Sequence, residues 1–179
     1  MNADWAAAFA GDVWLGDTWC GRDFRGRRVA VIASGADATW AVPKVVATAA
    51  RTKVFLEDPG WVLPRLPTPL SGSARAAFAV PVAGPLARRL VARAHLRSAV
   101  KDPWVRRLLT PDDRFARHHA AFGGGFYAAL QDPRCTLVRW PVYAITADGV
   151  RSAEGVEHRV DSLIIPDPAR HSLQPSLGP

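Results

Sequence analysis

The chain of 179 residues is long enough for one domain with a sizeable core, and its 49% hydrophobic and 22% charged residues are typical of a globular protein. Its net charge of +7 comes mainly from arginines spread along the chain, a pattern that does not by itself indicate nucleic-acid binding. There is no apolar run long enough to span a membrane and no basic signal-peptide start, and the two cysteines, Cys20 and Cys135, are too few for a disulfide framework or a zinc site. We expect a cytoplasmic protein with no membrane partner, no nucleic-acid partner and no metal site.

The first predicted elements form a strand–helix–strand unit. Val29–Ala33 is a continuous apolar run, typical of a strand that is buried on both faces. Residues 37–50, "DATWAVPKVVATAA", carry apolar side chains at helical spacing, and Pro43 is expected to cap a short first turn or to kink the helix. A second strand, "TKVFLE", follows at 52–57. Strand, helix and strand within about 30 residues predict a βαβ unit and a parallel sheet.

The rest of the chain alternates between predicted loops, helices and strands. Residues 58–73 are rich in Pro, Gly and Ser and predict a loop, whereas 85–100 and 102–109 predict helices, the second opened by Asp102 and Pro103. The glycines 123–125 predict a flexible loop before a short helix. Three strand-like segments, 135–140, 142–150 and 156–165, follow, and the pair Asp148-Gly149 is a strong hairpin signal. The Pro-rich tail 166–179 is expected to be loosely held.

Five ordered motifs carry a resemblance to a known family. The segment "FAGDVWLGDTWC" supplies Phe9, Gly11 and Trp19 at the spacing of the signature F-x-G-x-x-x-H-x-x-x-W of class B flavoprotein monooxygenases, above all those of the Baeyer–Villiger type. The other four matches are "FRGRRVAVIASGADATWAVPKVV", "KVFLEDPGWVLPR", "VKDPWVRRLLTPDDRF…FYAAL" and "GVRSAEGVEHRVDSLII". The chain thus resembles the NADP-binding domain of that family, from about Phe9 to Ile165.

The resemblance implies an α/β fold: a Rossmann-like parallel sheet with flanking helices, a helical insertion, and a β-hairpin or meander near the C-terminus. We expect residues 1–165 to form one such domain, with 166–179 as a tail. The family's FAD domain has no counterpart in this sequence, so we expect no bound flavin. The face that the FAD domain covers in the family would need another cover, which predicts a homo-oligomer or a heteromer.

Several replacements fall on the positions that the resemblance assigns to the cofactor. Leu15 stands where the signature has histidine, and Ala33 stands where the glycine turn has its first glycine. Gly35 and Ala36 match the turn, and Asp37 replaces a serine or similar small residue at the helix start. Asp37 is either a plain N-cap or a charge that repels a pyrophosphate, and both interpretations weaken phosphate binding. We therefore predict that NADP is not bound and that side chains occupy the pyrophosphate position.

NAD remains an alternative cofactor. The family holds the 2′-phosphate of NADP with an Arg and a Thr or Ser, and Glu57 and Asp58 stand at those positions. An acid about 20 residues after a glycine turn is able to bind the ribose 2′-hydroxyl of NAD. If a nucleotide does bind, Gly35, Ala36 and Glu57 are the residues expected to hold it.

The catalytic candidates are His118, His119 and Asp37. The two adjacent histidines replace a Lys-Arg pair that contacts NADP in the family, and imidazoles titrate near neutrality, which suits general acid–base chemistry. The alternative is that both are surface residues of a loop. Metal binding by this pair is not favoured, because adjacent side chains diverge.

A candidate ligand pocket surrounds the former cofactor cleft. Trp14, Leu15, Trp40 and Asp58 are its predicted lining. Large rings there either plug the cleft or create an apolar pocket for a different small molecule. The favoured function is therefore a cofactor-independent enzyme of isomerase, cyclase or lyase type, acting on a small molecule in specialised metabolism. The alternatives are a non-catalytic partner of a complete enzyme and an NAD(P)H-binding accessory subunit.

Overall fold

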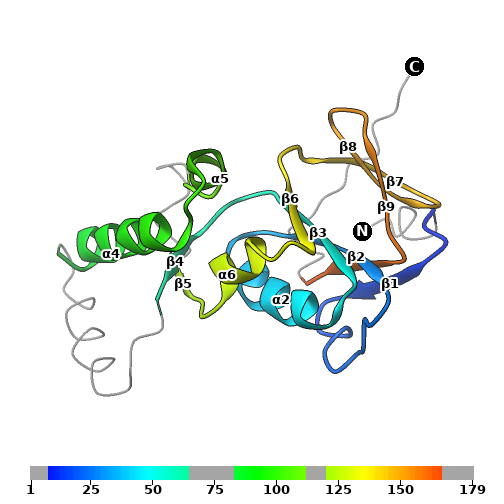
Figure 1. The fold of residues 1–179 in the computed structure, drawn as a ribbon, viewed down its shortest axis with the longest axis horizontal. Helices are drawn as coiled ribbons and strands as arrows, with labels where there is room; N and C mark the ends of the chain where they lie inside the picture. The colour runs from blue at the N-terminus through cyan, green and yellow to red at the C-terminus, as the bar shows by residue number, and fades with distance from the viewer. Residues whose placement is uncertain (1–7, 65–82, 112–119, 167–179) are drawn as a thin grey trace.

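A parallel sheet of five strands forms the centre of the protein (Figure 1). The computed structural model describes residues 8–64, 83–111 and 120–166. In spatial order the strands are β1 (Asp12–Leu15), β10 (Ser162–Ile165), β2 (Arg28–Ala33), β3 (Arg51–Leu56) and β6 (Cys135–Val138). Every neighbouring pair runs parallel, which confirms the predicted α/β architecture.

Both faces of this sheet are buried. Along β2, Val29, Val31 and Ala33 belong to a hydrophobic cluster shared with α2 (Gly35–Thr48). Ala30 and Ile32 point the other way, into a second cluster that includes Val150 of the antiparallel strands. Because successive side chains of a strand face opposite sides, a strand covered on both faces is apolar at every position, as the sequence predicts for β2.

The helix after β2 begins earlier than predicted. It starts at Gly35 rather than near Asp37, and it runs unbroken to Thr48. Pro43 lies in the middle of this helix, so it does not cap a short first turn. The short helix α6 (Phe126–Leu130) packs against α2 (Figure 1).

The helical insertion lies to one side of the main sheet (Figure 1). It contains α4 (Ala83–Ala99), α5 (Pro103–Leu108), and a parallel pair of short strands, β4 (Trp61–Leu63) and β5 (Ala120–Phe122). The prediction that 58–73 is wholly loop is wrong at β4, whose three residues are buried. At α5 the prediction is confirmed, because the Asp102 carboxylate accepts hydrogen bonds from the Trp104 and Val105 amides at 2.7 and 3.4 Å.

Three antiparallel strands form the predicted meander. They are β7 (Val142–Thr146), β8 (Gly149–Ser152) and β9 (Glu157–Arg159). The segment 156–165 is not one strand as predicted: the chain leaves β9 at Val160 and enters the main sheet as β10.

The predicted hairpin and the predicted glycine loop are both present, with differences in detail. Gly149 pairs with Thr146 at the start of β8, so the two-residue loop of the hairpin is Ala147–Asp148. A Cβ at Gly149 would lie 2.1 Å from the carbonyl oxygen of His158, so the glycine permits close strand packing. Residues 123–125 form a loop before α6, as predicted, and within this loop Gly123 is buried against Thr39 of α2.

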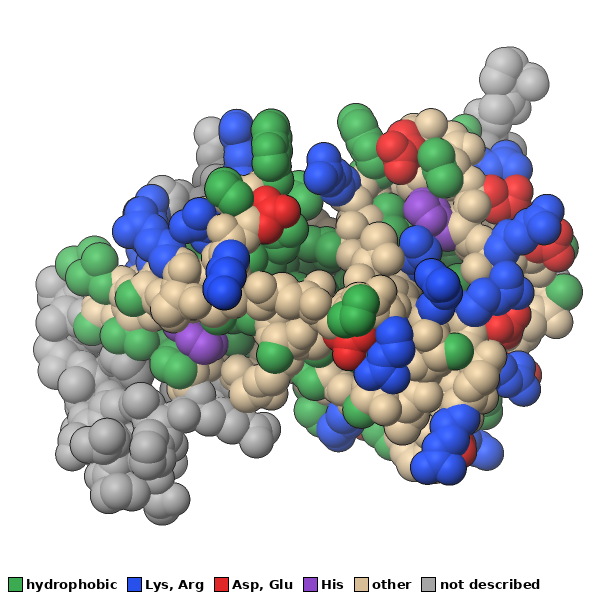
Figure 2. Space-filling model, viewed as in Figure 1, with side chains coloured by type: hydrophobic (Ala, Val, Ile, Leu, Met, Phe, Trp, Pro, Cys, Tyr) green, Lys and Arg blue, Asp and Glu red, His purple; other side chains and the backbone are tan. Residues whose placement is uncertain are grey.

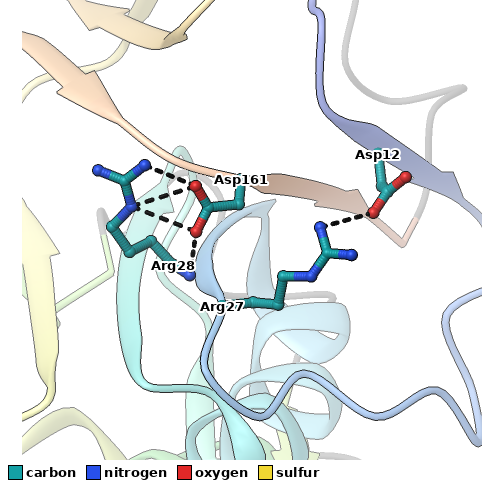
Figure 3. Close-up of polar contacts among 4 residues, drawn as sticks. All are labelled: Asp12, Arg27, Arg28 and Asp161. Carbon is teal, nitrogen blue, oxygen red and sulfur yellow. Dashed lines mark hydrogen bonds and ion pairs between the residues drawn. The ribbon is translucent and has the colours of Figure 1, made fainter.

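Ion pairs join the amino ends of the central strands (Figure 3). The Asp161 carboxylate, just before β10, accepts hydrogen bonds from the Arg28 backbone amide at 2.8 Å and from the Arg28 guanidinium. Beside it, Arg27 pairs with Asp12 of β1 at 3.0 Å. These contacts fix how β1, β10 and β2 start relative to one another. Among the described residues, no helix has the length and hydropathy that crossing a membrane requires.

Candidate functional site

The turn between β2 and α2 lies at the carboxyl edge of the parallel sheet, where open α/β sheets bind their ligands. Ser34 takes the N-cap position with extended backbone, and its side chain makes no capping hydrogen bond. Gly35 follows with φ of 36°, a left-handed conformation that favours glycine. The turn that the sequence predicts is therefore present. Its positive φ explains why position 35 is a glycine.

The amide of Gly35 already has a partner. It donates a hydrogen bond of 2.8 Å to the backbone carbonyl of Asp58, and the Glu57 amide donates one of 3.3 Å to the carbonyl of Ala33. The loop after β3 is thereby bonded to the glycine turn in both directions. In a dinucleotide site the first amides of this helix point at the pyrophosphate. Here the Gly35 amide donates to a backbone carbonyl instead. The sequence predicts side chains, rather than backbone, at the pyrophosphate position.

Asp37 is not the N-cap. It lies half-buried in the first turn of α2, three residues after Ser34, which holds the cap position. A carboxylate there is stabilised by the helix dipole, which also favours anions at the same place. A bound pyrophosphate would therefore meet a fixed negative charge, with a repulsion of roughly 3 kcal/mol for unit charges about 5 Å apart at an effective dielectric of about 20.

Ala33 is buried in the sheet, as its place at the end of the apolar run Val29–Ala33 predicts. It is the last residue of β2, its exposure is 0%, and it belongs to the hydrophobic cluster that includes α2. No non-glycine residue of the described chain has a positive φ, so Ala33 needs no glycine conformation. The methyl group of Ala33 therefore packs in the core.

Glu57 and Asp58 lie at the carboxyl end of β3, as the sequence predicts. Glu57 and Asp58 follow the last residue of β3 directly, Glu57 half-buried and Asp58 exposed. With Asp37, the turn and the adjoining loop carry three carboxylates and no lysine or arginine. Carboxylates at these positions oppose the approach of phosphate groups.

The predicted pocket residues come from β1, from α2 and from the loop after β3. Trp14 is half-buried on β1, and the Arg22 guanidinium lies 4.8 Å from its ring centroid. Trp40, 40% exposed, meets the edge of Trp19 at 4.8 Å between centroids. Leu15, at the end of β1, is 37% exposed.

Sequence reasoning missed a cluster of tryptophans and cations beside α2. The Lys44 ammonium lies 4.0 Å from the Trp40 ring centroid and 5.9 Å from that of Trp19. Arg22 is placed over Trp14 in the same way. The four-residue spacing of Trp40 and Lys44 on a helix was the one signal in the sequence, because side chains at that spacing share a face.

The proposed catalytic histidines, His118 and His119, lie outside the described residues. Within residues 8–64, 83–111 and 120–166, no three His, Cys, Asp or Glu side chains gather in a way that would hold a metal ion. Asp37 is thus the catalytic candidate with a described position.

The chain is similar in sequence to monooxygenases. No family model matches the chain. A Baeyer–Villiger monooxygenase of Pseudomonas aeruginosa is 28% identical over 168 residues, covering 79% of this chain and 32% of that protein. An uncharacterized monooxygenase of Mycobacterium tuberculosis is 32% identical over 165 residues, covering 78% and 33%. The chain spans about a third of the length of these relatives.

The fold is also similar to that of solved monooxygenase structures. A solved structure of an oxidized steroid monooxygenase bound to NADP superposes with a TM-score of 0.71 at 20% identity, covering 89% of this chain and 42% of that one. A closed structure of cyclohexanone monooxygenase gives the same TM-score and identity. These likenesses confirm the fold that the five sequence motifs imply.

Proposed function

Because this chain is a relative of the Baeyer–Villiger monooxygenases that spans about a third of their length, we propose that it is a nucleotide-domain homologue that holds no dinucleotide at its glycine turn. It acts instead on a small organic molecule by acid–base chemistry, as an isomerase, cyclase or lyase would. Neither flavin nor NADP takes part in this reaction. The occupied amide of Gly35 is the observation that carries the proposal.

The hydrogen bond from Gly35 to Asp58 supports the proposal because it engages a backbone amide that would otherwise be free to bind phosphate. An incoming pyrophosphate would have to replace a bond of 2.8 Å and displace the loop after β3. The Gly35 amide is buried and Asp58 is exposed, so the bond has the ordinary net worth of an intramolecular hydrogen bond, about 0.5–1.5 kcal/mol. The carboxylates of Asp37, Glu57 and Asp58 would add repulsion to that cost.

The same carboxylates provide the acid–base groups of the proposed reaction. Asp37 is held half-buried at the start of α2, where it is able to accept a proton from a bound substrate. His118 and His119 are the proposed partners that return a proton. A base and an acid on opposite sides of a substrate suffice for an isomerisation or an elimination without an electron carrier.

Equilibrium binding and turnover test this function. The purified protein is titrated with NADPH and, separately, with NADH to 1 mM by calorimetry; the proposal predicts no saturable binding of either. Micromolar binding of NADPH would overturn it, and micromolar binding of NADH alone would favour the NAD alternative through Glu57. A metabolite panel is then incubated with the protein without added cofactor, and Asp37→Asn is expected to lower any turnover at least tenfold.

A second candidate, a non-catalytic partner subunit, has one observation in its favour. Leu86 and Leu90 lie four residues apart on α4 and are 61% and 69% exposed, and Trp104 of α5 is 64% exposed. Hydrophobic side chains reach the surface in this region, among lysines and arginines (Figure 2). Sedimentation of the wild type and of Leu86→Glu/Leu90→Glu tests it: a dimer that the double variant dissolves favours an interface, and a monomer in both cases opposes self-association.

A further inference from the structure

We propose that a hollow between the β1–β2 loop and α2 binds a small carboxylate that has an apolar body, such as an aromatic acid. The hollow has a volume of about 100 Å³. Its walls include Trp19, Cys20, Arg22 and Phe24 of the loop, and Lys44 and Thr48 of α2. This site is separate from the glycine turn and goes beyond the proposed function.

The apolar part of the ligand would meet the exposed edges of two largely buried aromatic rings. Trp19 and Phe24 line the hollow and are 3% and 4% exposed, so their positions are fixed by the core beneath them. Trp40 packs against Trp19 edge to face and supports it from the helix side. An aromatic or short aliphatic body placed there contacts only the exposed edges of these rings, so the two cations supply most of its binding.

The charged part of the ligand has two cations available. Lys44 and Arg22 both line the hollow. Each is held over a tryptophan face, at 4.0 Å for Lys44 on Trp40 and 4.8 Å for Arg22 on Trp14. In the part of the chain that the structure describes, neither forms an ion pair with a carboxylate. Two positioned cations without an anion favour a negatively charged ligand.

The size of the hollow narrows the ligand class. A volume of about 100 Å³ corresponds to about three water molecules of liquid. A carboxylate on a single ring or short chain fits, with its far end in solvent, whereas a dinucleotide does not. Cys20 also lines the hollow and is exposed, so its thiol reports on whether the hollow is filled.

The site does not depend on the proposed function. Lys44 lies nine residues after Gly35 on α2, which places it about 13 Å further along the helix axis. A ligand there leaves the β2–α2 turn free. The inference therefore stands or fails separately from the question of whether NADP binds.

The test uses benzoate as the probe and Cys20 as the reporter. The full-length protein is labelled with N-ethylmaleimide, a neutral reagent, and Cys20 modification is followed by peptide mass spectrometry against benzoate concentration. Benzoate is expected to slow labelling saturably, at least fivefold at saturation, while benzyl alcohol and sulfate do not. Lack of protection at 50 mM benzoate, or equal protection by benzyl alcohol, overturns the proposal.

Variants test whether protection of Cys20 by benzoate depends on the charges of Lys44 and Arg22. Lys44→Gln and Arg22→Gln are each expected to raise the benzoate concentration for half-maximal protection about fivefold. Arg25→Gln, in the same loop but outside the hollow, is the matched control and should leave it unchanged. Lys44 is exposed, so Lys44→Gln is expected to keep the fold, and a thermal melt checks this. If Lys44→Gln behaves like Arg25→Gln, the assignment of the site is wrong.

Discussion

The backbone amide of Gly35 donates its hydrogen bond to the carbonyl of Asp58, 2.8 Å away. This single contact joins the glycine turn to the loop that follows the next strand. Open α/β sheets bind their ligands at this carboxyl edge, beside the first helix after a glycine turn. The turn has a glycine in a left-handed conformation, but the amide of this glycine donates to a carbonyl of the same chain.

Replacing Gly35 by alanine tests whether this conformation is needed. A side chain at φ of 36° is strained, so Gly35→Ala is expected to lower the free energy of unfolding by about 1–2 kcal/mol. Urea denaturation followed by circular dichroism measures it. Gly124→Ala is the control, because Gly124 is exposed and its φ is not positive. Equal stability of the two variants would contradict the assigned backbone geometry.

Replacing Gly149 by alanine tests the close contact of β8 and β9. The added Cβ would lie 2.1 Å from the His158 carbonyl oxygen, so the strands must separate, at a cost of about 1–3 kcal/mol. Asp148→Ala, one residue earlier in the exposed loop, should change stability by less than about 0.5 kcal/mol. A Gly149→Ala protein that unfolds at the wild-type urea concentration would show that the strands are further apart than described.

The Asp161 carboxylate predicts a specific dependence of stability on pH. Hydrogen bonds from the Arg28 side chain, and then from its backbone amide, hold the Asp161 pKa below its usual value. A group with a lowered folded-state pKa stabilises the protein above its unfolded value of about 4 and loses that effect as the pH falls further. Between pH 5 and 3 the wild type should therefore lose more thermal stability than Asp161→Asn does.

The control for this pH experiment is Asp23→Asn. Asp23 pairs with Arg25 at 3.8 Å, and both side chains are largely exposed, so the variant should follow the wild-type pH profile. At pH 7 Asp161→Asn is expected to cost about 1 kcal/mol after solvent screening. Parallel pH profiles for the wild type and Asp161→Asn would show that this contact contributes nothing.

The two cysteines should differ in reactivity. Burial, and to a lesser extent the nearby Asp132 charge, raises the pKa of the Cys135 thiol to about 12. Since the thiolate is the nucleophile, N-ethylmaleimide at pH 7.5 should label Cys135 at least tenfold more slowly than the exposed Cys20. Peptide mass spectrometry gives both rates. Denatured protein should show similar rates at the two sites, and similar rates in the folded protein would refute the burial of Cys135.

The elements predicted correctly are those whose signal is local. β2 is apolar at every buried position, and α2 repeats its apolar residues at helical spacing, so each identifies itself without knowledge of its partners. β4 was missed because three apolar residues among prolines become a strand only beside β5, which is far away in sequence. The break between β9 and β10 was missed for the same reason, because Asp161 is held by Arg28 from a distant part of the chain.

The candidate site was predictable in its position but not in its bonding. Gly35, Asp37 and Glu57 lie at the carboxyl edge as the spacing predicts. The partner of the Gly35 amide could not be read from the sequence, because a backbone carbonyl carries no residue-specific signal. The contact of Lys44 with Trp19 also depends on how the β1–β2 loop folds against α2, which no periodicity encodes.

The resonance of the Gly35 amide in a ¹H–¹⁵N correlation spectrum tests the central claim most directly, since this group cannot serve both Asp58 and a pyrophosphate. On titration with NADPH to 1 mM, the account predicts an unshifted peak that stays protected from solvent exchange. A saturable shift of this peak at micromolar NADPH would contradict it.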